Sequence, residues 1–390
     1  MFEESIAIER KLLEGQVEKI LAESDRGAQS NKDKVAWSGW RKFKISKIVE
    51  ENQSITSFYF IPHDGKSLAS FLPGQHLTFR LKVPGLSKPV IRCYSLSDSA
   101  DKAYYRISVK KQSSPAAKLD VPNGVASTYL HEVLEVGDVV DVKAPSGKFY
   151  LDQTEKTPIV MIGGGIGVTP SLSMLNALAA EKSQRKMYFF YAVQRAEELI
   201  MSEQIKTLSY QLPNLMVVRF YSEADGVTVS EFERLGYVDI ATMHALSIPW
   251  DSDFYVCGPP PMMQAVVGGL EREGVDTGRI HFESFGPASV SKRSVEYKAQ
   301  ADTNTESHLI TFTMSDTQVE WSQAKGSILD VAESAGVNME SGCRAGSCGS
   351  CLTAIAEGKV SYIDEPGVEI EKGSCLACIA VPAGDLKLNA

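Results

Sequence analysis

The run Glu340-Ser-Gly-Cys-Arg-Ala-Gly-Ser-Cys-Gly-Ser-Cys-Leu352 carries three cysteines with the spacing Cys-x4-Cys-x2-Cys. A fourth follows in Cys-Leu-Ala-Cys-Ile-Ala-Val-Pro382. This spacing is typical of four thiolates that hold a [2Fe-2S] cluster. Glycines and small residues between the ligands let the backbone wrap tightly and point amide N–H groups at the sulfur atoms. We therefore predict a one-electron centre held by Cys343, Cys348, Cys351 and one cysteine of the later segment.

Two other uses of these cysteines must be weighed against a cluster, a structural zinc site and a disulfide pair. Zinc sites usually combine two short Cys-x2-Cys pairs. Here three ligands crowd one loop and the fourth comes from a distant segment, which favours the cluster. Cys375 is a rival for the fourth ligand.

Size and charge limit the classes of function. A chain of 390 residues is expected to form two or three domains. Its net charge is −9, and residues 305–390 contribute −7 of this, with twelve Asp or Glu against five Lys or Arg. The sign disfavours nucleic-acid binding. The acidity of the last region either attracts a basic partner or only keeps the surface soluble.

The N-terminal residues have no apolar signal region, and no stretch of 18 apolar residues occurs, so we expect no membrane span. Seven cysteines in so long a chain do not suggest a disulfide scaffold. A labile cluster is expected in a reducing compartment, so a cytoplasmic protein is predicted.

Changes of pattern divide the chain into five regions. Residues 1–38 show apolar residues at helical spacing and are predicted to form a helical extension. Short β-rich runs fill residues 39–153 and predict an antiparallel barrel. Strands and helices alternate over residues 154–287, which predicts an α/β domain with a parallel sheet. Residues 288–305 are polar and are predicted to be a linker, and residues 306–390 carry the cysteines.

Within the α/β region, apolar runs predict strands at 159–162, 187–193, 215–221 and 254–257. The same reading predicts helices at 171–182 and 196–208.

The barrel region contains Arg92-Cys-Tyr-Ser-Leu-Ser97. A flavin needs a cation for its phosphate, an aromatic ring against the isoalloxazine and a hydroxyl near the reactive nitrogen, which Arg92, Tyr94 and Ser95 can supply from one strand. Gly124-Val-Ala-Ser127 precedes a predicted helix at 128–133 and offers backbone N–H groups to a phosphate or pyrophosphate. Ser127 could equally be an ordinary N-cap. The predicted flavin contacts of this loop are Gly124, Val125, Ala126 and Ser127.

The α/β region contains Gly163-Gly-Gly-Ile-Gly-Val-Thr-Pro170 between a strand and a helix. Such a turn allows close backbone approach to a dinucleotide pyrophosphate, whose charge suits the helix N-terminus. Val256-Cys-Gly-Pro-Pro-Pro-Met-Met263 is a second strand-to-helix turn that could form a wall beside a nicotinamide. Cys257 could instead be a small buried core residue. The predicted nicotinamide-cofactor contacts are Gly163, Gly164, Gly165, Gly167, Thr169, Pro170, Cys257, Gly258 and Pro259.

The order of these strings, ending with Glu283-Ser-Phe285, resembles the ferredoxin–NAD(P)+ reductase superfamily. With a plant-type ferredoxin region after them, residues 40–390 resemble the reductase components of Rieske and di-iron oxygenases. The resemblance implies a multidomain fold of flavin-binding β-barrel, parallel-sheet α/β nucleotide domain and α+β β-grasp ferredoxin domain. It also favours Cys378 over Cys375 as a ligand, because of the Ile-Ala-Val-Pro that follows.

Roles for individual residues follow from the same resemblance. Lys110 would contact the flavin together with Arg92 and Tyr94. Glu283 would lie near the hydride path, and Phe285 would shield the flavin ring. The residues implied at the site of hydride transfer are Ser95, Cys257, Glu283 and Phe285.

The identities of two cofactors stay open. Tyr105-Arg-Ile-Ser-Val-Lys-Lys111 and Lys143-Ala-Pro-Ser-Gly-Lys-Phe149 resemble the FAD-using, flavohaemoglobin-type branch, although some related reductases use FMN. A 2′-phosphate would need paired basic groups after strand 187–193. Only Arg195 lies there, and Glu197 and Glu198 would repel a phosphate, so NADH is expected over NADPH.

The expected activity is a relay from NADH through flavin and [2Fe-2S] to a terminal oxygenase component, because flavin converts a hydride into single electrons. A different acceptor, such as a hybrid-cluster protein, is an alternative, as is a stand-alone oxidoreductase acting on a small molecule such as nitric oxide. A redox sensor is a third reading. The sequence holds no Rieske pair of Cys-x-His with Cys-x-x-His.

Overall fold

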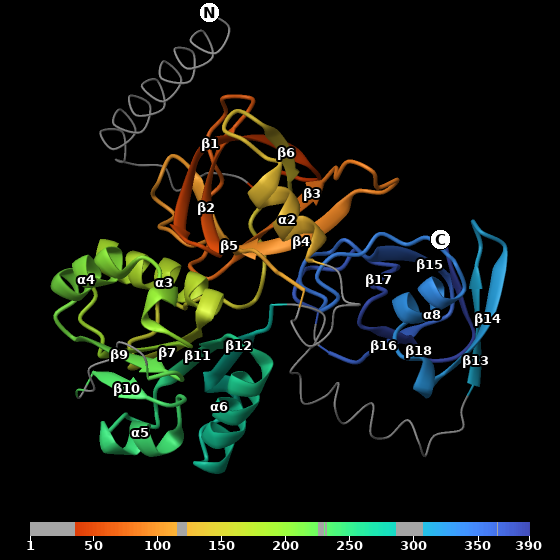
Figure 1. Cartoon of the computed structure of the whole chain (residues 1–390). Helices are drawn as coiled ribbons and strands as arrows, with labels where there is room; N and C mark the ends of the chain where they lie inside the picture. The colour runs from red at the N-terminus through yellow and green to blue at the C-terminus, as the bar shows by residue number, and fades with distance from the viewer. Residues whose placement is uncertain (1–35, 115–122, 225–229, 231, 286–306, 365) are drawn as a thin grey trace, which may run out of the picture. The chain divides into compact units, whose positions relative to one another are not determined.

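The computed structural model describes residues 36–114, 123–224, 230, 232–285, 307–364 and 366–390. The predicted helical extension at 1–38 lies almost entirely outside these residues, and so does the predicted linker at 288–305. The chain forms two compact units, one made mostly of residues up to Glu283 and the other mostly of residues from Ser284 onward (Figure 1). In the described part of the chain, no helix is long and apolar enough to cross a membrane.

The first sheet of the first unit is a closed barrel. Its six strands follow the order β4-β3-β6-β1-β2-β5. An antiparallel bridge between Leu96, directly after β4, and Ile107 on β5 joins the two edges. Closure leaves no open edge, and Phe43, Phe58 and Phe79 fill the interior with no exposed surface. The strands are β1 (Arg41–Asn52), β2 (Ile55–Pro62), β3 (His76–Leu81), β4 (Val90–Ser95), β5 (Tyr105–Lys110) and β6 (Val139–Val142).

Helix α2 (Val125–Glu132) packs Ala126 and Leu130 into the barrel core. The prediction of a helix at 128–133 was therefore wrong at its start, which lies three residues earlier. Gly124 is the N-cap, so Ser127 is not the N-cap. The Ser127 hydroxyl instead accepts from the amide of Gln112 at 3.1 Å and donates to the Gly124 carbonyl at 3.0 Å.

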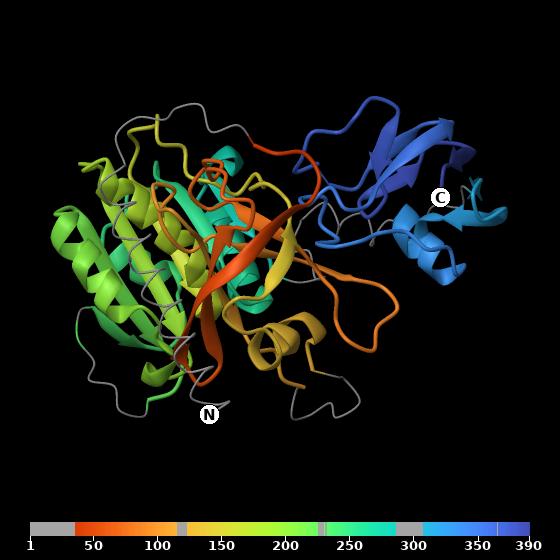
Figure 2. The same ribbon diagram turned by 90° about the horizontal axis from the view of Figure 1, so that it is seen from above.

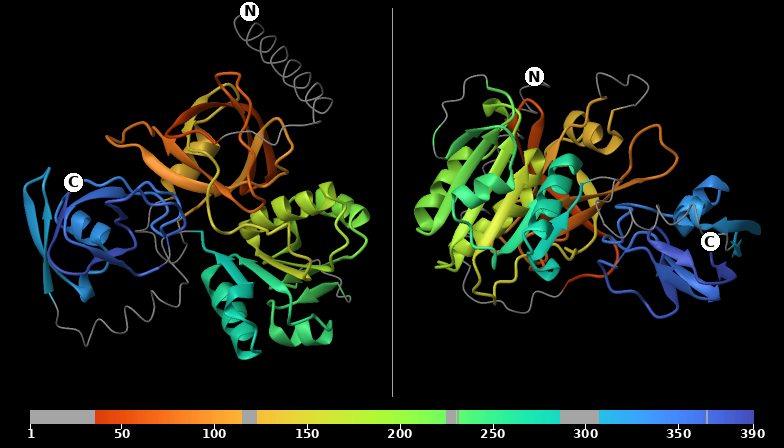
Figure 3. Two further views of the ribbon diagram at one scale, coloured as in Figure 1. Left: turned by 180° about the vertical axis from the view of Figure 1, so that it is seen from behind. Right: turned by 90° about the horizontal axis from the view of Figure 1, so that it is seen from below.

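The second sheet is parallel throughout, with the order β10-β9-β8-β7-β11-β12. Helices α3 and α4 cover one face, and α5 and α6 cover the other (Figures 1 and 3). Figure 2 shows the same unit from above. The elements are β7 (Ile159–Gly164), η1 (Gly165–Gly167), α3 (Val168–Ala180), β8 (Met187–Val193), η2 (Ala196–Glu198), α4 (Ser202–Gln211), β9 (Leu215–Tyr221), β10 (Glu233–Leu235), α5 (Ile240–Ala245), β11 (Asp253–Cys257), α6 (Pro260–Arg272), η3 (Thr277–Arg279) and β12 (Ile280–Glu283).

Two predicted helices of this domain need correction. Helix α3 begins at 168 and not at 171, because the glycine turn itself coils as η1 and because Pro170 is tolerated in a first turn. The helix predicted at 196–208 is broken into η2 and α4. Ile200 is buried and donates its amide to the Tyr191 hydroxyl at 3.2 Å, and Met201 has a left-handed φ of 55°.

The second unit contains a mixed five-stranded sheet with the order β14-β13-β19-β15-β17 and a small β16-β18 pair. Helix α8 (Ile328–Ser334) buries Ile328, Leu329 and Val331 against them, which is the arrangement of a β-grasp fold. Ser327 and Asp330 form a capping box at the start of α8. The other elements are β13 (Ser307–Phe312), β14 (Thr317–Ser322), η4 (Gln323–Lys325), β15 (Leu352–Glu357), β16 (Val360–Tyr362), β17 (Ser374–Leu376), β18 (Ala380–Pro382) and β19 (Leu386–Leu388).

Candidate functional site

The parallel sheet has a topological switch point between β7 and β11. From β7 the chain proceeds to β8 and β9 on one side, and it returns to place β11 and β12 on the other. Ligands of open parallel sheets bind beyond the carboxyl ends of the strands at such a point. The two glycine-containing turns predicted from the sequence follow β7 and β11, so the fold brings them together at this edge.

The two turns are packed too closely for side chains. A Cβ on Gly167 would lie 2.6 Å from the Cys257 carbonyl carbon and 2.8 Å from Gly258 Cα. A Cβ on Gly164 would lie 2.7 Å from Pro259 Cδ. These glycines are therefore needed for the two turns to form one surface.

The start of α3 suits a pyrophosphate. Gly167, its N-cap, has no side chain to occupy the first amide groups, and the first turn contains no acidic residue. Gly165 has a φ of 53° and open space where a side chain would be. Thr169 and Pro170 are buried, and the Thr169 hydroxyl donates to the Ile166 carbonyl at 3.0 Å, which holds the turn. The backbone of this turn, free of side chains at its glycines, and the helix N-terminus can bind a negative group here.

One acidic residue that was not selected from the sequence lies at the same edge of the parallel sheet. Glu223 follows β9, and its amide donates to the Gln194 carbonyl at 2.9 Å. Its carboxylate lies 3.3 Å from Arg195 Nε. Its position directly after a predicted strand could have indicated it, because the carboxyl ends of adjacent parallel strands meet at one edge of the sheet.

The predicted flavin residues Arg92, Tyr94 and Ser95 all lie on β4 and differ in exposure. Arg92 is exposed, and its guanidinium donates to the Ile91 carbonyl at 2.7 Å. Tyr94 is half-buried, with its ring edge-on to Phe79 at 5.8 Å. Ser95 is buried. Lys110 lies at the end of β5 and is half-buried.

The start of α2 fits the phosphate groups of a flavin nucleotide. The N-cap, Gly124, leaves the first amide groups of the helix without a capping side chain. The hydroxyl of Thr128 is buried and has no hydrogen-bond partner among the described residues. A buried donor without a partner is costly, so a bound acceptor would stabilise it.

Glu283 connects the two domains of the first unit at the expected hydride site. Ser95 Oγ donates to Glu283 Oε2 at 3.4 Å, from the barrel to the end of β12. His76, a buried residue of β3, places Nδ1 3.5 Å from Glu283 Oε1. Sequence reasoning did not select His76, because only the packing of the barrel against the parallel-sheet domain brings it beside Glu283.

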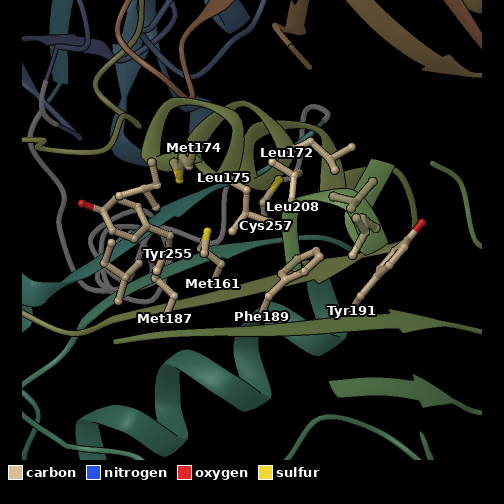
Figure 4. Close-up of a cluster of buried hydrophobic side chains, with 14 of the residues drawn as sticks. Met161, Leu172, Met174, Leu175, Met187, Phe189, Tyr191, Leu208, Tyr255 and Cys257 are labelled. Atoms are coloured by element: carbon tan, nitrogen blue, oxygen red, sulfur yellow. The ribbon is translucent and has the colours of Figure 1, made fainter. Parts of the chain in front are cut away.

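Cys257 is the neighbour of Glu283 across the β11–β12 pair. Its side chain is 1% exposed and belongs to the buried cluster beneath α3 (Figure 4). Burial, followed by the charge of Glu283, raises the pKa of the Cys257 thiol well above its usual value. A neutral thiol is therefore present at the edge of this site. Phe285 is 42% exposed, and its predicted place at the flavin ring stays a prediction.

The four predicted cluster ligands lie together in the second unit. Hydrogen bonding with Cys348, and then with Cys378, holds the pKa of Cys343 far below its usual range. Cys351 Sγ lies 3.1 Å from Cys378 Sγ. The four thiols therefore gather in one place. Within the described ranges, no three His, Cys, Asp or Glu side chains converge on one metal ion. Two irons need only two thiols each, so these four thiols can ligate a [2Fe-2S] cluster.

Backbone amides of the cysteine loop point at sulfur as predicted for such a cluster. The amides of Ala345 and Ser347 donate to Cys343 Sγ at 3.4 and 3.2 Å, and the amide of Cys343 donates to Cys348 Sγ at 3.3 Å. Arg344 adopts a left-handed φ of 55°, which helps the loop to fold back. The donor set and its amides fit the cluster.

Cys375, the rival ligand, is fully buried on β17, where it pairs with Thr353. Burial raises the pKa of its thiol to about 12. Cys375 is therefore a core residue of the β-grasp domain.

Comparison with known families assigns all three regions. Residues 42–150 match the family described as "Oxidoreductase FAD-binding domain". Residues 161–268 match "Oxidoreductase NAD-binding domain", and residues 311–383 match "2Fe-2S iron-sulfur cluster binding domain". The three predicted cofactors, FAD, a nicotinamide dinucleotide and [2Fe-2S], are thereby confirmed.

Individual relatives cover different parts of the chain. The flavohemoprotein of Bacillus cereus is 37% identical over 256 residues, which are 65% of this chain and 62% of that protein. This chain thus spans less than two thirds of that relative. The flavohem-like FAD/NAD-binding domain of nitric oxide dioxygenase from Vibrio cholerae is 33% identical, with 63% of this chain and 99% of that domain covered and a TM-score of 0.56.

A third solved structure covers nearly the whole chain. Phthalate dioxygenase reductase, described as a modular structure for electron transfer from pyridine nucleotides to [2Fe-2S], is 26% identical. The likeness covers 90% of this chain and 98% of that one, with a TM-score of 0.56.

Proposed function

Because this chain belongs to the ferredoxin–NAD(P)+ reductase superfamily and carries a plant-type [2Fe-2S] ferredoxin domain, we propose that it transfers electrons from NADH to a separate oxygenase. The NAD(P)H–flavin–[2Fe-2S] reductase architecture is established by the domains themselves. The proposal adds the donor, the site residues and the partner, a Rieske or di-iron oxygenase. The domain limits proposed are 39–153, 154–287 and 306–390.

The observation that carries the proposal is the hydrogen bond from Ser95 to Glu283. It joins the flavin strand to the strand beside the β11 turn, so both cofactor supports meet at one point. When bound, flavin supplies the conversion between a two-electron hydride and single electrons. Ser95 would hold the Glu283 carboxylate at the reacting edge. Glu283, with His76 on its other oxygen, would hold or move a proton there.

The remaining residues would bind and orient the cofactors. Arg92 and the start of α2 would hold the flavin phosphates, with Tyr94 against the ring. The start of α3 would hold the pyrophosphate of the nicotinamide cofactor. The proposed ligands of the cluster are Cys343, Cys348, Cys351 and Cys378.

The proposed preference for NADH rests on charge at the ends of β8 and β9. Arg195 is the basic residue at this edge that could attract a 2′-phosphate, and Glu223 already pairs with it. Glu197 and Glu198 add two more negative charges nearby. A ribose hydroxyl is compatible with these carboxylates, whereas a 2′-phosphate is repelled.

An oxygenase is proposed as the acceptor because the chain has a one-electron outlet and its 390 residues contain no Rieske pair. The likeness of 90% of this chain to phthalate dioxygenase reductase supports this partner class. The reducing cytoplasm is the proposed location, since thiolate-bound clusters persist there.

A stand-alone oxidoreductase or a reductase for another acceptor is the alternative. It is favoured by the identity of 37% with a flavohemoprotein, which exceeds the 26% with phthalate dioxygenase reductase.

The experiment starts from the full chain, reduced anaerobically with NADH while the flavin and cluster absorbances are followed. The reduced protein is then mixed separately with a purified Rieske oxygenase, a purified di-iron hydroxylase and nitric oxide. Fast reoxidation by one oxygenase, lost in Cys348→Ser, supports the proposal. Fast reoxidation by nitric oxide alone, retained in that variant, would overturn it.

A further inference from the structure

A buried guanidinium lies between the two domains of the first unit. Arg106, on β5, is 6% exposed, and its Nη1 lies 3.3 Å from Asp98 Oδ2. Its Nε donates to Ser97 Oγ at 3.1 Å, and its Nη2 also donates to the Ser97 carbonyl. The partners that balance the charge of Arg106 therefore belong to the barrel domain and lie two and three residues after Ser95.

One further contact of Arg106 leaves the barrel. Nη2 donates to Gln204 Oε1 of α4 at 3.1 Å. Gln204 Nε2 then donates to Asn176 Oδ1 of α3 at 3.2 Å, and Asn176 Nδ2 donates to the Leu172 carbonyl at 2.7 Å. Gln204 thus links β5, α4 and α3 through a single side chain.

The direction of this chain of hydrogen bonds is fixed by Arg106. A guanidinium only donates, so Gln204 must turn its oxygen toward it and its NH2 group toward Asn176. Asn176 must then accept from Gln204 and donate to Leu172. The side-chain amides of Gln204 and Asn176 make all of these hydrogen bonds in only one orientation, which restricts both side chains.

The hydrogen bonds from Arg106 through Gln204 to Asn176 connect the elements that carry the two proposed cofactor sites. On the barrel side, Ser97 continues directly from the strand that carries Ser95. On the other side, Asn176 belongs to α3, whose first turn follows Gly167. A second contact nearby runs the same way, since Ser173 Oγ of α3 donates to the Asp98 carbonyl at 3.0 Å.

We propose that Gln204 is a positioning residue that sets the distance between the flavin strand and the nicotinamide turn. The inference rests on the proposed function, because it concerns the same hydride step. Hydride transfer needs reacting atoms about 3–3.5 Å apart, and a displacement of about 1 Å can cost roughly 10²-fold in rate. Gln204 contacts neither reacting centre and acts through α3.

The test compares Gln204→Met with Gln211→Met in the full-length protein loaded with flavin and cluster. Gln211 is an exposed residue at the end of the same helix, so it is a matched control. The limiting rate of flavin reduction by NADH is measured by anaerobic stopped flow over a series of NADH concentrations. For Gln204→Met we expect a rate about tenfold lower, with an apparent NADH affinity within about twofold of the parent. Gln211→Met is expected to match the parent.

Two readouts separate positioning from a general loss of structure. The long-wavelength charge-transfer absorbance formed with NAD+ on the reduced protein should weaken in Gln204→Met. Amide hydrogen exchange should quicken in α3 and α4 and not in the barrel strands. Gln204→Glu, which keeps the contact with Arg106 but reverses the link to Asn176, should recover only part of the rate.

A limiting rate within about twofold of the parent in Gln204→Met would overturn the inference, as would a loss explained by global unfolding in both variants. Preference of the parent for NADPH would contradict the proposed function and leave this test intact, because the same rates can be measured with either donor.

Discussion

Replacing Gly167 with alanine should push the turn after β7 away from the turn after β11. Gly167 has an ordinary φ of −64°, so alanine causes no backbone strain there. The added Cβ would lie 2.6 Å from the carbonyl carbon of Cys257, whereas ordinary contact begins at 3.4 Å. Since the atoms it would meet belong to the backbone of Cys257 and Gly258, no side chain can move aside, and the two turns have to separate by about 1 Å.

A separation of about 1 Å predicts that the limiting rate of flavin reduction by NADH falls roughly 10²-fold. This loss corresponds to about 2.7 kcal/mol of transition-state stabilisation. The assay is anaerobic stopped flow at saturating NADH, with thermal unfolding measured in parallel.

The matched control is Gly268→Ala in α6, where no atom lies within 4 Å of the new Cβ. It should leave the rate unchanged and raise stability slightly, because alanine favours a helix. The steric reasoning would be refuted if folded Gly167→Ala protein were reduced within about threefold of the parent rate.

Three other predictions concern the cluster, the donor and pH. Cys348→Ser should abolish reduction of the cluster while NADH-to-ferricyanide activity persists; simultaneous loss of both would contradict a linear relay. Glu223→Gln should raise the ratio of kcat/KM for NADPH over NADH about fivefold, since one charge at about 4 Å in water is worth ~1 kcal/mol; an unchanged ratio would remove Glu223 from donor selection. Burial lowers the pKa of His131 from 6.5, so the unfolded chain binds the proton more readily, and stability should fall as pH drops below that value. His131→Gln should reduce the loss of Tm between about pH 7.5 and about pH 5.5, and an equal loss in both proteins would count against this assignment.

The sequence predicted the strands of the parallel sheet that are mostly apolar. Strands 187–193 and 215–221 match β8 and β9, because mostly apolar runs bounded by turns have few other uses. The prediction of one helix at 196–208 was wrong because the amide of Ile200 donates to the Tyr191 hydroxyl. Local spacing cannot reveal this contact.

The cofactor-binding stretches could be located because close backbone approach requires glycine and cluster ligation requires cysteine. His76 and Glu223 could not be selected in the same way. Each lies on a different segment from its partner, so its contacts depend on which strands pair and on how the two domains pack. Sequence spacing therefore selects the glycine turns and the cysteine loop more readily than the polar residues beside them.

The position of β11 between β7 and β12 has a consequence for the nascent chain. Strand β7 emerges from the ribosome some 90 residues before its neighbour, yet Gly167 and Cys257 must pack backbone against backbone. Until β11 arrives, the apolar edge of β7 stays unpaired, and such an edge invites association with other chains. Joining the two glycine turns and protecting this edge are thus one late event of biosynthesis, which makes stalled or truncated chains prone to aggregate.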